Sequence, residues 1–186
     1  MLWCFGDSFT YGVKCHPEDE YYQRYESNGV MELKKTWPEL LSDYLGMELM
    51  NVSEAGLSNV EILTNLCINL KHINENDWVV VSDTSPIRIK TFKEKRWSEV
   101  ELPEHSDVVM DYILEEVIPF EVEWKNWMRD TVENVFESLD GVHCRFWSHE
   151  IWDRFHTITQ HTDGEINDLH WSWKGHEEMF KYIKGK

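Results

Sequence analysis

The 186-residue chain has no long apolar run. A membrane-spanning helix needs about 20 consecutive apolar residues, and a secretory signal needs an apolar region of about 7–15 residues. The amino-terminal run Met1-Leu2-Trp3-Cys4-Phe5 meets Gly6-Asp7 before either could develop. We therefore expect a protein without a membrane segment or a signal peptide, located in the cytoplasm.

Basic residues are also scarce. The chain has 18 Lys and Arg against 35 Asp and Glu, which gives a formal net charge of -17. This charge repels phosphate backbones and anionic lipid surfaces wherever salt does not screen it. Broad binding to nucleic acid or to a membrane surface is therefore not expected.

The cysteines and histidines lack the spacing of a metal site. Cys4, Cys15, Cys67 and Cys144 form no C-x-x-C pair, and a chain of this size does not require disulfides, so free thiols are predicted. The histidines between residues 156 and 176 do not form an H-E-x-x-H pattern. Neither a bound metal nor a cofactor is predicted.

What the sequence does have is an alternation of short apolar runs with segments of helical period. Strands are expected over 2–5, 47–52, 77–81 and 142–147, and helices over 37–45, 58–73, 107–138 with a break near Pro119, and 172–183. This alternation is typical of an α/β domain with a mostly parallel sheet. The stretch 85–105, which includes Trp97, is expected to be a long loop. No repeat or linker interrupts the chain, so residues 1–186 are interpreted as one domain.

A candidate nucleophile follows the first expected strand, in Gly6-Asp7-Ser8-Phe9-Thr10-Tyr11-Gly12. A serine hydroxyl attacks well only when an imidazole takes its proton and a carboxylate orients that imidazole. Asp168 and His170, in the expected loop before the last helix, can supply both groups, because loops at the carboxyl ends of parallel strands converge. Asp7 is either a second acid/base carboxylate or, as we favour, a ligand of backbone amides in the turn.

Three blocks, in order, resemble the SGNH (GDSL-like) hydrolase superfamily. The first is the Ser8 segment, the second is Asn51-Val52-Ser53-Glu54-Ala55-Gly56-Leu57-Ser58-Asn59, and the last is Asp168-Leu169-His170-Trp171-Ser172-Trp173-Lys174-Gly175-His176. The resemblance covers the whole chain. It implies a flavodoxin-like three-layer α/β/α sandwich with a mostly parallel sheet of about five strands. It also implies a Ser8-His170-Asp168 triad that hydrolyses esters, and an oxyanion hole with the amides of Ser8 and Gly56.

The chain departs from this superfamily after the third strand. The superfamily pattern there is Gly-x-Asn-Asp, with the Asn amide in the oxyanion hole, whereas this chain has Ser82-Asp83-Thr84-Ser85-Pro86-Ile87-Arg88. Small, often phage-encoded relatives are similar at this place, with Thr-Ser-Pro followed by Arg. Thr84 is accordingly predicted to be the third oxyanion donor.

Three further residues are candidates for substrate binding, each with an alternative role. Arg88 can clamp an anionic substrate or pair with Asp83, and the ion pair is favoured. Asn59 can line the pocket or cap the helix, and capping is favoured. Trp171 can offer an aromatic face to a sugar or anchor the last helix in the core.

The leading interpretation is a serine esterase or deacetylase that acts on a small-molecule or carbohydrate ester, including an O-acyl group on a carbohydrate. The alternative is a binding or structural module of the same fold with little turnover, carried by a phage and recognising carbohydrate, because a fold alone does not guarantee chemistry. A phage origin would place the protein in the host cytoplasm or in the virion. The natural substrate, its acyl chain length and the oligomeric state cannot be read from the sequence.

Overall fold

A four-stranded parallel sheet forms the centre of the structure. The computed structural model describes residues 1–12, 35–84, 90–93, 96–99, 121–148 and 173–185. The sheet contains β1 (Leu2–Phe5), β2 (Leu49–Asn51), β3 (Trp78–Ser82) and β6 (His143–Trp147), in the order β2-β1-β3-β6. Counted along the chain, this is 2-1-3-4, which matches the first four strands of the flavodoxin-like order. The predicted α/β fold with a parallel sheet is therefore confirmed.

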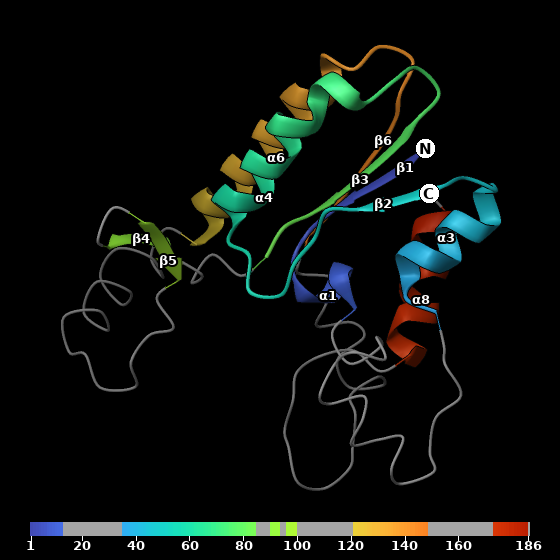
Figure 1. Cartoon of the computed structure of the whole chain (residues 1–186), viewed down its shortest axis with the longest axis horizontal. Coiled ribbons are helices and arrows are strands. Elements are labelled where there is room, and N and C mark those ends of the chain that lie inside the picture. The colour runs from blue at the N-terminus through green and yellow to red at the C-terminus, as the bar shows by residue number, and fades with distance from the viewer. Residues whose placement is uncertain (13–34, 85–89, 94–95, 100–120, 149–172, 186) are drawn as a thin grey trace, which may run out of the picture.

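Helices cover both faces of this sheet (Figure 1). One layer consists of α3 (Trp37–Leu45) and α8 (Trp173–Lys184), and the opposite layer consists of α4 (Asn59–Asn69) and α6 (Glu121–Glu137). A short 3-10 helix (Leu70–His72) continues α4. The arrangement is the three-layer α/β/α sandwich that the sequence resemblance implied.

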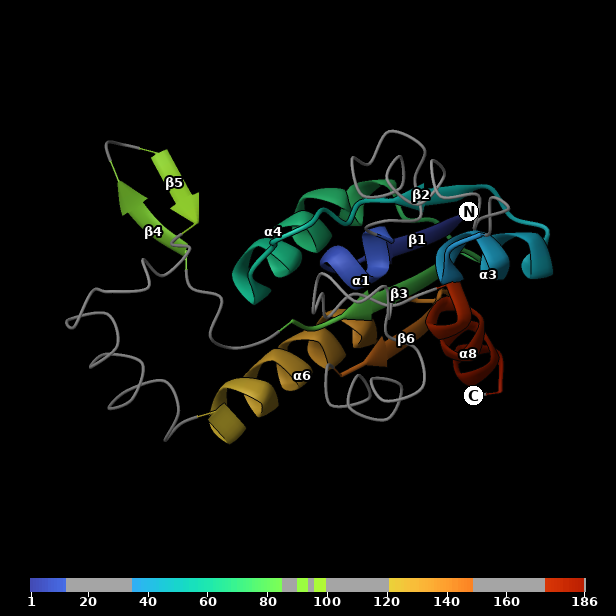
Figure 2. The same cartoon turned by 90° about the horizontal axis from the view of Figure 1, so that it is seen from below.

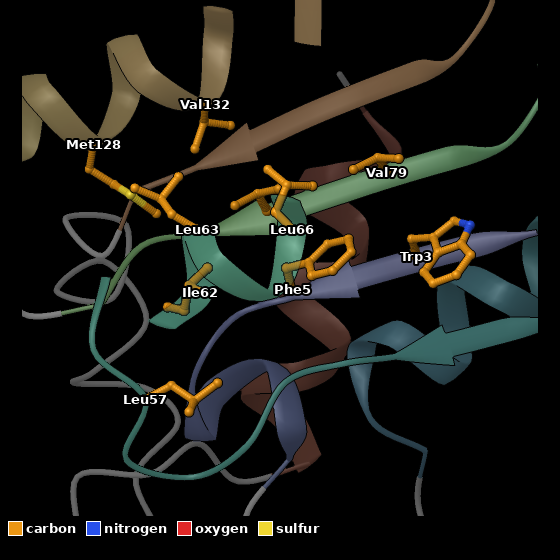
Figure 3. Close-up of a cluster of buried hydrophobic side chains, with 10 residues drawn as sticks. Trp3, Phe5, Leu57, Ile62, Leu63, Leu66, Val79, Met128 and Val132 are labelled. Carbon is orange, nitrogen blue, oxygen red and sulfur yellow. The ribbon is translucent and has the colours of Figure 1, made fainter. Parts of the chain in front are cut away.

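The two cores follow from the alternation of side chains along the strands. The face toward α3 and α8 buries the cluster Leu2, Cys4, Phe9, Trp37, Leu41, Val80, Trp147, Met179 and Ile183. The opposite face buries the cluster Trp3, Phe5, Leu57, Ile62, Leu63, Leu66, Val79, Val81, Met128 and Val132, most of which Figure 3 labels. Each fully buried Leu, Val or Phe stabilises the fold by about 1.5–3 kcal/mol, so both helical layers are held mainly by apolar packing.

Helices α3 and α4 begin at the caps that the sequence predicted, whereas the expected start of the 107–138 helix lies outside the described residues. Thr36 caps α3 and Ser58 caps α4, each in a capping box with the glutamate three residues later. At the end of α3, Gly46 has φ 64, a left-handed conformation that favours glycine. Thr36 and Ser58 thus end the loops that leave the carboxyl edge of the sheet, whereas Gly46 ends α3 before the start of β2, at the amino edge.

The stretch 85–105 is not simply a loop as predicted. It contains an antiparallel hairpin of β4 (Lys90–Lys93) and β5 (Arg96–Glu99), in which Phe92 and Trp97 are register partners. Figure 2 shows this hairpin apart from the parallel sheet. Each strand has only four residues, and about half of these are charged, so an alternation of apolar and polar residues does not stand out in the sequence.

The amino edge of the sheet is held by a buried carboxylate. Asp77 accepts the amino-terminal ammonium of Met1 at 2.6 Å, the Trp3 indole N–H at 3.1 Å and the Asn74 amide at 2.9 Å. Burial alone would raise the pKa of Asp77, but these donors outweigh it, and the pKa lies below its usual value. The ionised carboxylate therefore stabilises the start of β1 and β3.

The part of the chain that the structure describes contains no helix with both the length and the apolar content to cross a membrane. Its three cysteines, Cys4, Cys67 and Cys144, are free thiols. Cys4 is buried in the sheet and burial raises its pKa, whereas Cys67 is exposed on α4.

Candidate active site

Ser8 begins a one-turn helix at the carboxyl end of β1. The helix α1 (Ser8–Tyr11) has Asp7 as its N-cap and ends at Gly12, whose φ of 83 is left-handed. Ser8 is 2% exposed, and its Oγ makes no hydrogen bond to any described residue. A buried hydroxyl without a partner costs about 1–3 kcal/mol. No described hydrogen bond therefore explains why the Ser8 hydroxyl is buried at this edge.

Gly6 allows α1 to approach β3. A Cβ on Gly6 would lie 2.1 Å from Ser82 Oγ and 2.2 Å from Thr10 Oγ1. These two hydroxyls are 2.8 Å apart and hydrogen-bonded to each other. The requirement for glycine before Asp7 therefore comes from this close approach.

Asp7 fixes the turn before Ser8. Its Oδ1 accepts the Phe9 amide at 3.0 Å, which confirms the prediction that Asp7 binds backbone amides. Its Oδ2 accepts the Thr84 hydroxyl at 2.7 Å. Asp7 is fully buried, so the cost of burying its charge is offset in part by these two donors.

Asn51 connects α1 to the loop that carries Gly56. Its Nδ2 donates to the Thr10 carbonyl at 3.2 Å, and its Oδ1 accepts from both the backbone amide and the hydroxyl of Ser53. Gly56 has φ 85, so its place in the loop favours glycine. Asn51 belongs to the second block, where no role was predicted for it; its position at the end of a strand was the available signal.

The amides of Ser8 and Gly56 are among the backbone N–H groups of this edge that have no acceptor in the described part of the chain. They are the pair that the sequence resemblance assigned to an oxyanion hole. The loop of Gly56 passes beside α1 in Figures 1 and 2. Donors without acceptors beside a serine are what an oxyanion site requires.

Thr84 stands two residues beyond the end of β3 and is buried. Because a hydroxyl has one proton, and this one is donated to Asp7, Thr84 can donate to an oxyanion only after it leaves that carboxylate. Its role as third oxyanion donor stays a prediction.

Asn59 does not cap its helix, contrary to the favoured prediction. The cap of α4 is Ser58, and Asn59 is the first helical residue. The Asn59 side chain instead bonds the backbone of Thr84 twice: Nδ2 donates to the carbonyl at 3.0 Å, and Oδ1 accepts the amide at 2.8 Å. A serine one residue earlier satisfies the cap, which leaves the longer Asn amide free to reach the next loop.

The other predicted site residues lie outside the described residues: Arg88, Asp168, His170 and Trp171. The structure describes the helix that follows them, α8, whose His176 is buried and accepts the Trp37 amide on Nδ1 at 3.3 Å. His176 therefore forms part of the contact between α8 and the start of α3. A second buried carboxylate at this edge, Asp83, accepts the Ser148 hydroxyl at 3.0 Å, a contact that no sequence signal indicated.

Comparison with known proteins gives a likeness to solved structures and none to a sequence family. No protein-family model matches the chain, and a search of curated proteins finds no match. Among solved structures, the chain is similar to a protein from Desulfitobacterium hafniense DCB-2 that is assigned to the G-D-S-L family of lipolytic proteins. The identity is 14%, the TM-score is 0.46, and the match covers 99% of this chain and 97% of that one.

Proposed function

We propose that the protein is a serine esterase or deacetylase with Ser8 as nucleophile. The observation that carries this proposal is the Ser8 hydroxyl, which is buried without a described partner at the carboxyl edge of a parallel sheet. That edge is where open α/β sheets bind their ligands. A buried hydroxyl without a partner lowers the stability of the fold. A role as the reacting group would explain why it is there.

The proposed reaction has two halves. His170 takes the Ser8 proton while Oγ attacks the ester carbonyl, and Asp168 holds the imidazole in the required tautomer. His170 then protonates the leaving alcohol, the bond from the carbonyl carbon to the alcohol oxygen breaks, and an acyl-enzyme remains. In the second half, water gives its proton to His170 and attacks the acyl-enzyme, and Ser8 regains a proton as the acid leaves.

The negative charge of each tetrahedral intermediate would be held by the amides of Ser8 and Gly56. Two features support this assignment: neither amide has a described acceptor, and a hydrogen bond from Asn51 to α1 ties their two loops together. A preorganised donor of this type typically contributes about 10²–10³ in turnover. Asn59, Arg88 and Trp171 remain candidates for contacts to the substrate.

The direct test is covalent labelling. Ser8 is 2% exposed, so the first substrate should be small, such as p-nitrophenyl acetate, and the first probe a short fluorophosphonate. We expect mass spectrometry to find the probe on Ser8, and Ser8→Ala to lose hydrolysis by several orders of magnitude. Ser42→Ala is the control, since it removes a hydroxyl of α3 that donates to the Met47 carbonyl just beyond that helix, near the amino edge of the sheet and not the edge of Ser8. A Ser8→Ala variant as fast as wild type would refute the proposal.

The base is tested by pH. The wild-type rate should rise through about pH 6–7.5, as an imidazole of ordinary pKa near 6.5 becomes neutral, and His170→Ala should lose turnover. A rate that stays flat across that range, with the chemical step shown to be limiting, would exclude a histidine base.

A further inference from the structure

Three loops at the carboxyl edge are joined by one chain of buried and partly buried hydrogen bonds. It runs from the Asn59 side chain to the Thr84 backbone, from the Thr84 hydroxyl to Asp7, and from Asp7 to the Phe9 amide in α1. Its members come from the start of α4, the end of β3 and the turn after β1. Ser8 lies between the last two members of this chain.

Asn59 holds Thr84 by its backbone alone. The two bonds of 3.0 and 2.8 Å occupy both the carbonyl and the amide of Thr84, as a neighbouring strand would. These bonds fix the Thr84 backbone against the start of α4 and leave its hydroxyl available to donate elsewhere. The acceptor within reach is the buried Asp7 carboxylate, at 2.7 Å.

We propose that Thr84 is a positioning residue, which holds Asp7 and through it the Ser8 turn. The Thr84 hydroxyl donates to a buried carboxyl oxygen that lies at a short distance, 2.7 Å, and it cannot donate to a second acceptor at the same time. The other carboxylate oxygen caps the helix that begins with Ser8. Asn59 is the second positioning residue, since it aims Thr84 at Asp7.

This inference rests on the proposed function only for its kinetic consequences. A nucleophile must meet the carbonyl carbon in a narrow range of positions, and a displacement of about 1 Å can lower turnover about 10²-fold. Loss of the Thr84 hydroxyl leaves a buried carboxylate with one donor fewer, so the turn before Ser8 loosens.

Single substitutions give the first readout. Thr84→Val keeps the branched shape and removes the donor, so kcat should fall by about 10-fold to 10²-fold with KM changed much less. Thr84→Ser should restore most of the activity, because it restores the donor. Asn59→Ala should lower kcat in the same direction. Thr64→Val is the matched control: the Thr64 hydroxyl donates at 2.7 Å to a carbonyl on the exposed face of α4, so its loss should leave kcat unchanged.

A double-mutant cycle separates positioning from direct oxyanion donation. Asp7→Ser keeps an N-cap oxygen for Phe9 but is too short to accept from Thr84. If Thr84 acts through Asp7, the kcat loss of Thr84→Val should shrink to less than about twofold in the Asp7→Ser background. If the full loss persists there, Thr84 contacts the oxyanion itself and the positioning proposal is wrong.

Hydrogen exchange keeps the inference testable apart from hydrolysis. In Thr84→Val, exchange at residues 6–12 should speed up several-fold, while exchange in α8 should not change. Failure of fluorophosphonate to label Ser8 in wild type would refute the proposed function and leave this prediction standing. Unchanged exchange in Thr84→Val at residues 6–12 would refute the positioning role, whatever the labelling shows.

Discussion

Adding one methyl group at Gly6 should be among the most costly single changes in this protein. The Cβ of Gly6→Ala would lie 2.1 Å from Ser82 Oγ, 2.2 Å from Thr10 Oγ1 and 2.7 Å from Thr10 Cβ. All three distances are below those that real Cβ atoms show, and the two oxygens belong to buried side chains that are bonded to each other. One side chain cannot turn away without leaving the other hydroxyl short of a partner.

The expected cost combines two effects. Overpacking a tight core site typically costs about 1–3 kcal/mol, and loss of a buried hydrogen bond adds about 1 kcal/mol. Gly6→Ala should therefore lower the free energy of unfolding by about 2–4 kcal/mol. Because Gly6 directly precedes Asp7 and Ser8, the same strain should move α1 and lower the reactivity of Ser8.

Urea unfolding, followed by tryptophan fluorescence, measures this loss. Gly46→Ala is the control: its Cβ would meet nothing within 4 Å, but its φ is 64, so it should lose only the cost of a left-handed backbone, about 1–2 kcal/mol. Ser82→Ala added to Gly6→Ala should recover part of the loss by removing the nearest oxygen. A Gly6→Ala protein at least as stable as Gly46→Ala would refute the steric reasoning.

Three other predictions concern stability and thiol reactivity. The pKa of Asp77 is lower in the folded than in the unfolded protein, so the carboxylate stabilises the fold above about pH 4 and this contribution is lost as pH falls further. Asp77→Asn should be less stable at pH 7, with a flatter acid dependence of the urea midpoint; an unchanged slope would contradict this. His176→Phe leaves the Trp37 amide without its acceptor and should cost about 1–3 kcal/mol, whereas His176→Asn keeps an acceptor and should cost less; equal melting temperatures for the two would contradict the bond. In the native protein, maleimide should label exposed Cys67 well before buried Cys4, whose raised pKa also disfavours the thiolate, and peptide mapping after a time course would reveal any reverse order.

Much of the fold could be predicted because its signals are local. The cap residues Thr36 and Ser58, the glycine at 46 and the Val-rich strand β3 each act within one turn or one strand. The hairpin of β4 and β5 was missed because each strand has only four residues. Its pairing is set by cross-strand register, which periodicity in one strand does not encode.

For the described part of the candidate site, the turn that carries Ser8 and the loop that carries Gly56 could be placed from the sequence, but the hydrogen bonds between the loops could not. Ser8 and Gly56 could be placed because a strand end, a turn and a left-handed glycine are properties of short segments. The bonds between Asn59 and Thr84 cross 25 positions of sequence, and no local pattern distinguishes such a clamp from a helix cap. The strand order brings these two loops to one edge, and only this arrangement shows that Asn59 binds the Thr84 backbone and does not cap its helix.

The bond between Thr84 and Asp7 follows from the register of the sheet and the length of the side chain. Phe5 of β1 pairs with Val81 of β3. Asp7 follows Phe5 by two residues and Thr84 follows Val81 by three, so both lie where the two neighbouring strands leave the same edge of the sheet. A threonine hydroxyl is attached directly to Cβ and reaches only its immediate neighbours, and here that neighbour is a buried carboxylate. A longer amide at position 84 could extend past Asp7 toward Ser8. We therefore expect the shorter side chain to hold the turn that carries Ser8. Under the proposed function, stabilisation of an oxyanion would then depend more heavily on the amides of Ser8 and Gly56.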